Sequence, residues 1–310
     1  MIYLKLVLTM VFWGGTFIAA RYVSYHIGPF SGAFLRFLIA SFFFFPITFK
    51  QRKQILSIPT SIWIMLIFLG MSGIFAYNYF FFKGLNTVEA GRAAVIIATN
   101  PIFISLFAVI LFKEPMSKIN IVGILISVLG AMVVISKGDL GAILSEGIGH
   151  GEMLILGCVF SWVVYSILGK YVMKEISPVS AISISTYIGT TALFIPAFNE
   201  GLFEYLPSLN SLDWISLAYL GVFGTVLGFF WFYEGMNEIG AARASIFINL
   251  VPISAIIIAY FLLNETISVP IFLGIVLVIL GVYLTNRKLQ HDKQSDWMKK
   301  INRNIHLHKN

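Results

Sequence analysis

Charged residues are scarce in this sequence. Asp, Glu, Lys and Arg together make up 11% of its 310 residues, against roughly 25% in an ordinary soluble domain. Hydrophobic residues make up 58%, and the mean hydropathy is +0.89. Because the apolar excess extends along the whole chain, it excludes both a soluble domain and a soluble body with one membrane anchor. The composition predicts an integral membrane protein with several spans.

The sequence also has little of what enzymes and metal sites need. Its only cysteine, Cys158, has no partner, which excludes an intramolecular disulfide and the paired-cysteine patterns of metal and redox sites. It contains neither the HExxH motif of zinc enzymes nor a phosphate-binding loop, so we expect no metal, no cofactor and no ATP-driven cycle. The histidines all fall in predicted loops or in the tail: His26, His150, His291, His306 and His308.

One motif does suggest an enzyme. Residues 70–73 read GMSG, which resembles the nucleophile motif of intramembrane serine proteases. A serine nucleophile needs a base, normally a histidine inside the membrane, and none is predicted there. We therefore interpret Ser72 as a small residue that lets two helices approach closely, and we expect no enzymatic activity.

Ten apolar segments are long enough, or nearly long enough, to cross a bilayer, which takes about 20 helical residues. Runs such as residues 119–135 are apolar on every face, which favours helices over barrel strands. The first segment resembles a signal peptide, but it has a counterpart in the middle of the chain and so is predicted to belong to the fold. The segments are 3–22, 29–49, 61–82, 89–111, 118–136, 151–172, 178–197, 214–234, 240–262 and 269–286.

The net charge of +7 reflects topology rather than nucleic-acid binding, because the basic residues punctuate hydrophobic runs instead of forming one solvated patch. With a cytoplasmic N-terminus, most Lys and Arg fall on the inner side, including those of the tail after Asn286. The positive-inside rule then predicts a multi-pass protein of the cell (inner) membrane with both termini in the cytoplasm. The loop at 198–213, predicted to be external, contains acidic residues and no cation.

An internal repeat organises these segments. A shift of 151 positions aligns residues 62–133 with 213–284 without a gap, and about one third of the aligned positions carry the same residue. Near the start of each half, a shift of 149 aligns four more identical pairs: Trp13 with Trp162, Tyr22 with Tyr171, Pro29 with Pro178 and Ser31 with Ser180.

Each repeat contains five predicted helices, so the second copy must enter the membrane upside down relative to the first. Two inverted halves can exchange conformations, and an inward-open and an outward-open state then become similar in energy. The repeat therefore favours a secondary transporter that works by alternating access. A duplicated scaffold for a channel or a membrane sensor is the alternative.

The residues also resemble a known family. Each half resembles one EamA domain of the drug/metabolite transporter superfamily, through Trp13-Gly14, Pro29 followed by Arg36-Phe37, and two prolines that each precede a glutamate by thirteen residues. The resemblance implies an exporter of small metabolites, such as amino acids. It also implies four regions: a first EamA repeat at 1–136, an external linker at 137–150, a second repeat at 151–286 and a basic cytoplasmic tail at 287–310.

The resemblance further implies that the first, third and fourth helices of each half surround a central cavity. Polar and aromatic residues near the middle of these helices are the candidate substrate-binding residues, because an aromatic pocket with a few amides suits a small amphipathic compound. For any one of them, a place in the interfacial belt or in helix packing is the alternative. They are Trp13, Thr16, Tyr77, Asn78, Thr99, Asn100, Trp162, Tyr165, Trp231 and Asn249.

Other residues have predicted structural roles. Pro101 and Pro252 each fall in the middle of a predicted helix, where a proline produces a kink or a hinge. Arg36 lies inside the second span, where it either holds a substrate carboxylate or stabilises a hydrogen-bond network; we favour the network. Glu114 and Glu265 precede the last helix of each half and interact favourably with its N-terminus. Arg92 and Arg243 are expected to extend to the membrane surface.

The acidic residues bear on energy coupling. All 14 map to loops, span ends or the tail, whereas proton-coupled carriers usually place a carboxylate near the middle of the membrane. We therefore expect facilitated diffusion or exchange rather than proton antiport. The expected partners are a small-molecule substrate and the lipid bilayer, with no nucleic acid, and the sequence leaves the oligomeric state open.

Overall fold

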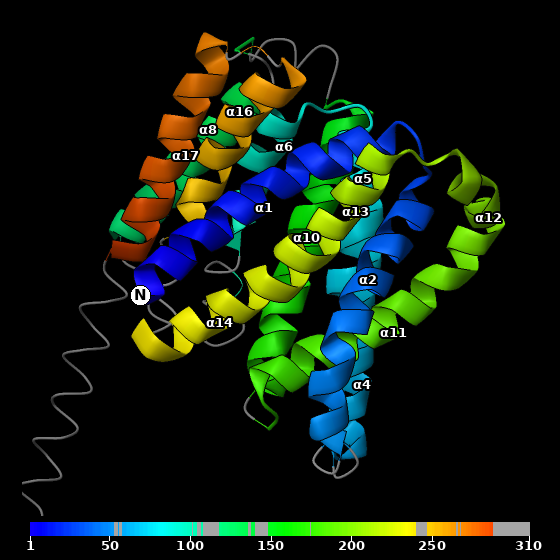
Figure 1. Ribbon diagram of the computed structural model, residues 1–310. Helices are drawn as coiled ribbons and strands as arrows, with labels where there is room; N and C mark the ends of the chain where they lie inside the picture. The colour runs from blue at the N-terminus through cyan, green and yellow to red at the C-terminus, as the bar shows by residue number, and fades with distance from the viewer. Residues whose placement is uncertain are drawn as a thin grey trace, which may run out of the picture.

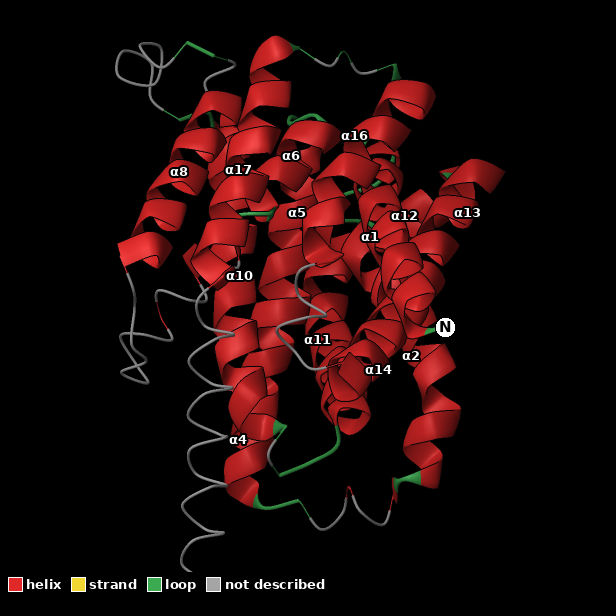
Figure 2. Cartoon of the chain, turned by 90° about the vertical axis from the view of Figure 1, so that its left-hand side faces the viewer, coloured by secondary structure: helices red, strands yellow, loops and turns green. Residues whose placement is uncertain are grey.

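The computed structural model is built from helices, and the part of the chain that it describes contains no strand (Figure 2). The described residues are 1–52, 55, 58–100, 102–103, 107, 118–135, 138–139, 148–173, 175–239, 247–264, 266 and 268–287. Pro101, Glu114, Arg243, Glu265 and the tail after residue 287 lie outside them, as do most of the predicted linker and the side chain of Asn249.

The first half of the chain forms helices that follow the predicted spans closely at their starts. Pro29 occupies the first position of the second helix, where its fixed φ suits the helix and its missing N–H costs no hydrogen bond. The helices are α1 (Ile2–Ser24), α2 (Pro29–Lys50), α4 (Thr60–Leu69), the π-helix η1 (Gly70–Ala76), α5 (Tyr77–Leu85), α6 (Ala90–Ile97) and α8 (Lys118–Ile135).

The second half repeats this order. Pro178 opens its second helix as Pro29 does in the first half, and a π-helix again interrupts its third span. The helices are α10 (His150–Val172), α11 (Pro178–Asn199), α12 (Leu202–Tyr205), the 3₁₀ turn η2 (Leu206–Ser208), α13 (Ser211–Tyr219), the π-helix η3 (Leu220–Leu227), α14 (Gly228–Ile239), the 3₁₀ turn η4 (Phe247–Asn249), α16 (Leu250–Leu263) and α17 (Val269–Arg287).

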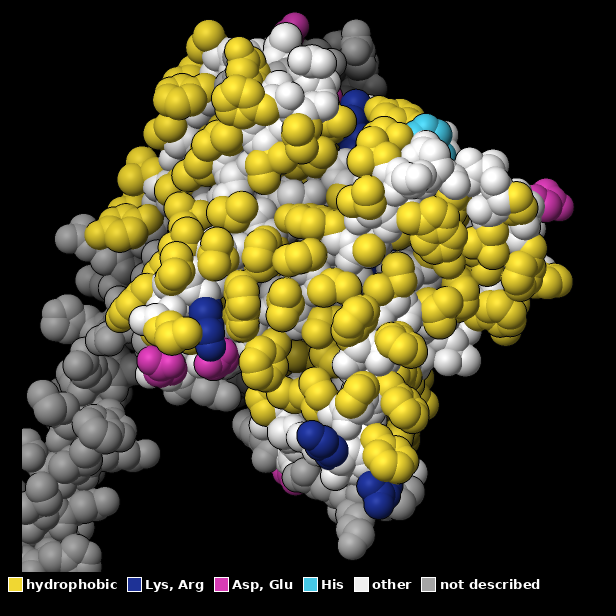
Figure 3. All heavy atoms as spheres, viewed as in Figure 1, with side chains coloured by type: hydrophobic (Ala, Val, Ile, Leu, Met, Phe, Trp, Pro, Cys, Tyr) yellow, Lys and Arg dark blue, Asp and Glu magenta, His cyan; other side chains and the backbone are white. Residues whose placement is uncertain are grey.

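Six helices in the described part are long and apolar enough to cross a membrane: Ile2–Ser24, Pro29–Lys50, Thr60–Leu85, His150–Gly169, Pro178–Asn199 and Ser211–Phe232. Shorter apolar helices, Ile121–Gly130, Leu250–Leu263 and Val269–Gly281, lie where three further spans are predicted. Hydrophobic side chains cover most of the face in Figure 3, with small groups of charged side chains mainly near its margins. The protein is therefore a helical multi-pass membrane protein.

The two halves contact each other in equivalent ways. Helix α1 packs against α13, η3 and α14, and its counterpart α10 packs against α4, η1 and α5. Likewise α2 contacts η3, α11 contacts η1, and the final helices α8 and α17 pack together. In Figure 1, α6, α8, α16 and α17 lie on one side, α2, α4 and α11 on the other, and α1 and α10 between them. Helices α1 and α10, which occupy equivalent places in the two halves, therefore lie near the centre.

Candidate functional site

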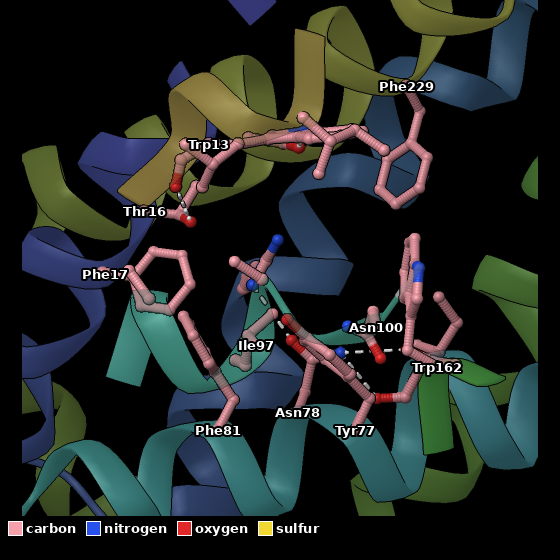
Figure 4. Close-up of a pocket in the computed structure, with 18 of the residues that line it drawn as sticks. Trp13, Thr16, Phe17, Tyr77, Asn78, Phe81, Ile97, Asn100, Trp162 and Phe229 are labelled. Atoms are coloured by element: carbon pink, nitrogen blue, oxygen red, sulfur yellow. Dashed lines mark hydrogen bonds between the residues drawn. The ribbon is translucent and has the colours of Figure 1, made fainter. Parts of the chain in front are cut away.

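A central cavity of about 120 Å³ lies where the two halves meet (Figure 4). Its wall is formed by α1, α2, η1 with α5, and the segment from α6 to Asn100 in the first half. The second half contributes α10, η3 with α14, and the region of η4 and α16. A cavity of this volume can hold several water molecules or a small ligand.

Six of the ten predicted substrate-binding residues lie on the cavity wall: Trp13, Thr16, Tyr77, Asn78, Asn100 and Trp162. Three others lie elsewhere. Thr99 is buried and donates a 2.7 Å hydrogen bond to the carbonyl of Ile96, Tyr165 packs beside Trp162 at a ring distance of 5.2 Å, and Trp231 is half-buried against Phe12 at 5.6 Å.

Aromatic rings from both halves line one part of the wall. The ring centroids of Tyr77 and Trp162 are 5.5 Å apart, and Phe229 lies 6.0 Å from Trp162 and 5.7 Å from Trp13. Figure 4 shows Trp13 and Phe229 above the cavity and Tyr77 below it, with Trp162 at the side. Rings in this arrangement can hold an apolar or aromatic part of a ligand. The sequence did not single out Phe229, because phenylalanines are frequent along the whole chain.

The two π-helices lie at equivalent positions and supply cavity residues. A π-helix widens the turn and disturbs the usual backbone pairing, and such segments are frequent at functional sites. In η3, the carbonyl of Gly224 accepts a 3.0 Å hydrogen bond from Nε1 of Trp13. In η1, the carbonyls of Gly73 and Ile74 accept hydrogen bonds of 3.3 and 2.8 Å from Nδ2 of Asn78. The π-turns thus expose backbone carbonyls that accept hydrogen bonds from the side chains of Trp13 and Asn78.

Arg36 also lies on the cavity wall and is 6% exposed. Its Nε donates to Oγ1 of Thr225 at 3.2 Å, and its Nη1 donates to Oδ1 of Asn78 at 3.0 Å. These bonds form the predicted hydrogen-bond network and join α2 to η3 and to α5. Arg36 also brings a positive charge to the cavity wall, so the alternative role that the sequence left open, binding of a substrate carboxylate, stays a prediction.

Irregular turns lie beside the cavity next to α6 and α16. Helix α6 ends at Ile97, and the backbone N–H of Thr99 bonds to the carbonyl of Ile96 in a tighter, 3₁₀-like turn. In the second half, η4 at Phe247–Asn249 precedes α16. The prediction that Pro252 lies in the middle of a helix is therefore wrong: it lies in the first turn of α16, where no intrahelical partner is needed for the missing N–H. Its role as a hinge stays a prediction.

The prediction that Arg92 extends to the membrane surface is also wrong. Arg92 is 5% exposed, and its Nη2 forms a 2.7 Å ion pair with Oε1 of Glu152. The pair joins α6 to the start of α10, and it gives the buried guanidinium the partner that a charge in this environment requires. Sequence reasoning missed it because the two residues are 60 positions apart.

Comparisons with known proteins agree with this architecture. The model of the EamA-like transporter family matches residues 1–136 and 149–287. The uncharacterized transporter YyaM of Bacillus subtilis is 32% identical over 286 residues, which cover 91% of this chain and 92% of that protein. An uncharacterized transporter of Archaeoglobus fulgidus is 29% identical, with 92% and 99% of the two chains covered.

More distant relatives extend the comparison. A WAT1-related chloroplast protein of Arabidopsis thaliana is 25% identical over 89% of this chain and 67% of its own length. One crystal structure resembles the fold with a TM-score of 0.63, covering 92% of this chain and 97% of the other at 18% sequence identity. That likeness supports the arrangement of helices alone.

Proposed function

The chain belongs to the EamA-like transporter family, and from this premise we propose that it is a secondary carrier that exports small metabolites by alternating access. Its family and its relatives' names indicate membrane transport of a small molecule rather than catalysis. We propose ten spans in two inverted five-helix repeats in the cell membrane, with both termini in the cytoplasm. Amino acids and related amphipathic compounds are the proposed substrates.

The observation that carries this proposal is the composition of the cavity wall. Equivalent residues of the two halves lie on it together: Trp13 with Trp162, Gly73 with Gly224, and Ile97 with Ile248. A single site built by two inverted halves can open to either side when the halves exchange conformations. The irregular turns beside the cavity support the same mechanism, since broken helices commonly form the substrate sites of such carriers.

The cavity also bears on energy coupling. No Asp or Glu lies on its described wall, so a proton-binding carboxylate at the site is missing from the described part of the chain. This favours facilitated diffusion or exchange over proton antiport. Uptake into everted vesicles should persist when a protonophore is added and the membrane potential is clamped. Collapse of uptake under these conditions would show that a proton gradient drives the carrier.

Reconstituted protein tests the carrier proposal directly. Proteoliposomes loaded with an unlabelled amino acid should take up the labelled compound transiently above its equilibrium level, and the rate should saturate with concentration. Linear flux with single-channel steps would instead support the alternative, a channel. Single cysteines introduced into the tail of a Cys158→Ser variant should react with a membrane-impermeant reagent in everted vesicles but not in intact cells.

A further inference from the structure

The guanidinium of Arg36 has bonding capacity that the protein does not use. A guanidinium has five N–H groups, and Nε and Nη1 each spend one on Thr225 and Asn78. In the described part of the chain, Nη2 donates to no group. An added Cβ at Gly224, a cavity residue, would lie 3.7 Å from this nitrogen, which places Nη2 at the edge of the cavity. At least one free donor pair therefore faces the site.

Arg36 also lacks the carboxylate partner that two other cations have. Lys5 pairs with Glu234 at 2.7 Å, and Arg92 pairs with Glu152 at 2.7 Å. Among the described residues, no carboxylate forms an ion pair with Arg36, although only 6% of its surface is exposed. A charge in a membrane interior is costly unless it is paired or serves a ligand. Two donors in one plane match a carboxylate.

We propose that Arg36 is the carboxylate-binding residue of the cavity, so that the transported compounds carry a carboxylate beside an apolar body. This proposal rests on the proposed function and specifies the chemistry of the same site. The aromatic wall alone would also suit an organic cation. The unpaired guanidinium reverses that preference, because it repels a cation and attracts an anionic or zwitterionic ligand.

An acceptor on the wall offers a place for a second polar group. The Oδ1 atom of Asn100 is buried without a hydrogen-bond partner, and Figure 4 shows this residue beside Tyr77 and Trp162. An α-ammonium group can bind to this acceptor, so an amino acid satisfies both ends of the site.

The carboxylate site exists in only one half. The carbonyl of Arg36 lies 2.9 Å from an added Cβ at Gly221, and in the other half the carbonyl of Ser185 lies 2.9 Å from an added Cβ at the equivalent Gly70. Ser185 thus occupies the place of Arg36 in the second half. The fold is duplicated, but the cationic side chain occurs in only one half. The site therefore binds one carboxylate, and in one orientation.

Two matched ligand series test the proposal on the purified, full-length protein in detergent. Each series keeps one apolar body and changes the polar groups: leucine, isocaproate and isoamylamine in one, and phenylalanine, hydrocinnamate and phenethylamine in the other. The amino acids and the acids should raise the melting temperature at millimolar concentration, and the amines should not. Equal stabilisation by the amines would overturn the proposal, and so would a failure of every carboxylate in both series to bind.

Variants then assign the effect to Arg36. Arg36→Met should weaken binding of the carboxylates by about tenfold or more, since charge-assisted hydrogen bonds are lost, and Arg36→Lys should weaken it less. The matched control is Thr190→Val, which removes a buried hydroxyl that lies away from the cavity wall and bonds to the carbonyl of Thr186. It should keep the Kd within a few-fold of the wild type.

The outcomes separate this proposal from the proposed function. If Arg36→Met remains monodisperse and binds carboxylates as tightly as the wild type, the carboxylate site is wrong, whatever the transport assays show. If Arg36→Met does not fold, the proposal is tested by the ligand series on the wild type and by carboxylate binding of Arg36→Lys. Selective carboxylate binding without saturable transport in proteoliposomes would instead contradict the carrier function and leave the binding site standing.

Discussion

Glu200 accepts a 2.7 Å hydrogen bond from the backbone N–H of Ser31, in the first turn of α2. The same carboxylate accepts a second bond of 3.3 Å from the N–H of Phe30. Glu200 directly follows the last residue of α11, and its counterpart Gln51 directly follows α2. Gln51 in turn accepts a 2.6 Å bond from Oγ of Ser180, in the first turn of α11. The two antiparallel helices are therefore tied together at both ends.

Removing this cap should destabilise the protein. Glu200→Ala leaves two N–H groups of α2 without their acceptor and removes a negative charge from a helix N-terminus, so we expect a loss of about 1 kcal/mol. Chemical unfolding of the detergent-solubilised protein measures this loss in the free energy of unfolding. Glu204→Ala, at an exposed glutamate on the adjacent α12, is the control and should change stability little. Equal effects of the two changes would mean that the cap does not stabilise α2.

Close approach of the two halves at Gly221 gives a second prediction. A Cβ added there would lie 2.8 Å from Cγ2 of Ile39 and 2.9 Å from the backbone oxygen of Arg36. The backbone oxygen cannot rotate away, so Gly221→Ala should destabilise the protein by about 1–3 kcal/mol. At Gly169 the nearest atoms are 3.6 and 3.7 Å away and belong to side chains. Gly169→Ala should therefore be neutral or slightly stabilising. Thermal unfolding of the two variants side by side checks this difference in stability. Equal stabilities would mean that α2 and η3 can move apart to make room for the added methyl group.

The two ion pairs should differ in strength. The side chains of Arg92 and Glu152 are 6% and 14% exposed, whereas those of Lys5 and Glu234 are 25% and 36% exposed. Removing one partner of a buried pair leaves an uncompensated charge, so Glu152→Ala should cost about 3 kcal/mol or more. Glu234→Ala should cost about 1 kcal/mol or less. Unfolding measurements at low and high salt check both values, and only the Lys5 pair should weaken clearly with salt. A larger loss for Glu234→Ala would contradict this order.

The sequence was sufficient for features that depend on spacing along the chain. The apolar runs located α1, α2, α10 and α11, and the repeat paired Trp13 with Trp162 before any contact was known. Pairs far apart in sequence, such as Arg92 with Glu152, had no local signal. Such contacts depend on how each helix is rotated about its axis, and uniformly apolar helices do not reveal this rotation.

The two π-helices show a second limit of the sequence. Hydrophobic periodicity assumes a regular helix and cannot reveal a wider turn. The π-turns change the rotation of the residues that follow, and this brings Phe229 to the cavity wall while Trp231 faces Phe12 instead. The tryptophan that the sequence predicted therefore lies off the wall, and the phenylalanine two residues before it lies on the wall.

The contrast between two tryptophans gives the last prediction. Trp162 lines the cavity and its ring lies between those of Tyr77 at 5.5 Å and Phe229 at 6.0 Å, whereas Trp231 lies away from the wall. Trp162→Ala removes a large apolar contact from the site, so saturable uptake in proteoliposomes should fall by about tenfold or more. Trp231→Ala removes an equally large side chain from the surface of α14 and should keep uptake within a few-fold of the wild type. Melting temperatures of both variants must accompany the assay, so that lost uptake is not mistaken for lost fold. If uptake depends on Trp231 and not on Trp162, the substrate follows a path outside this cavity.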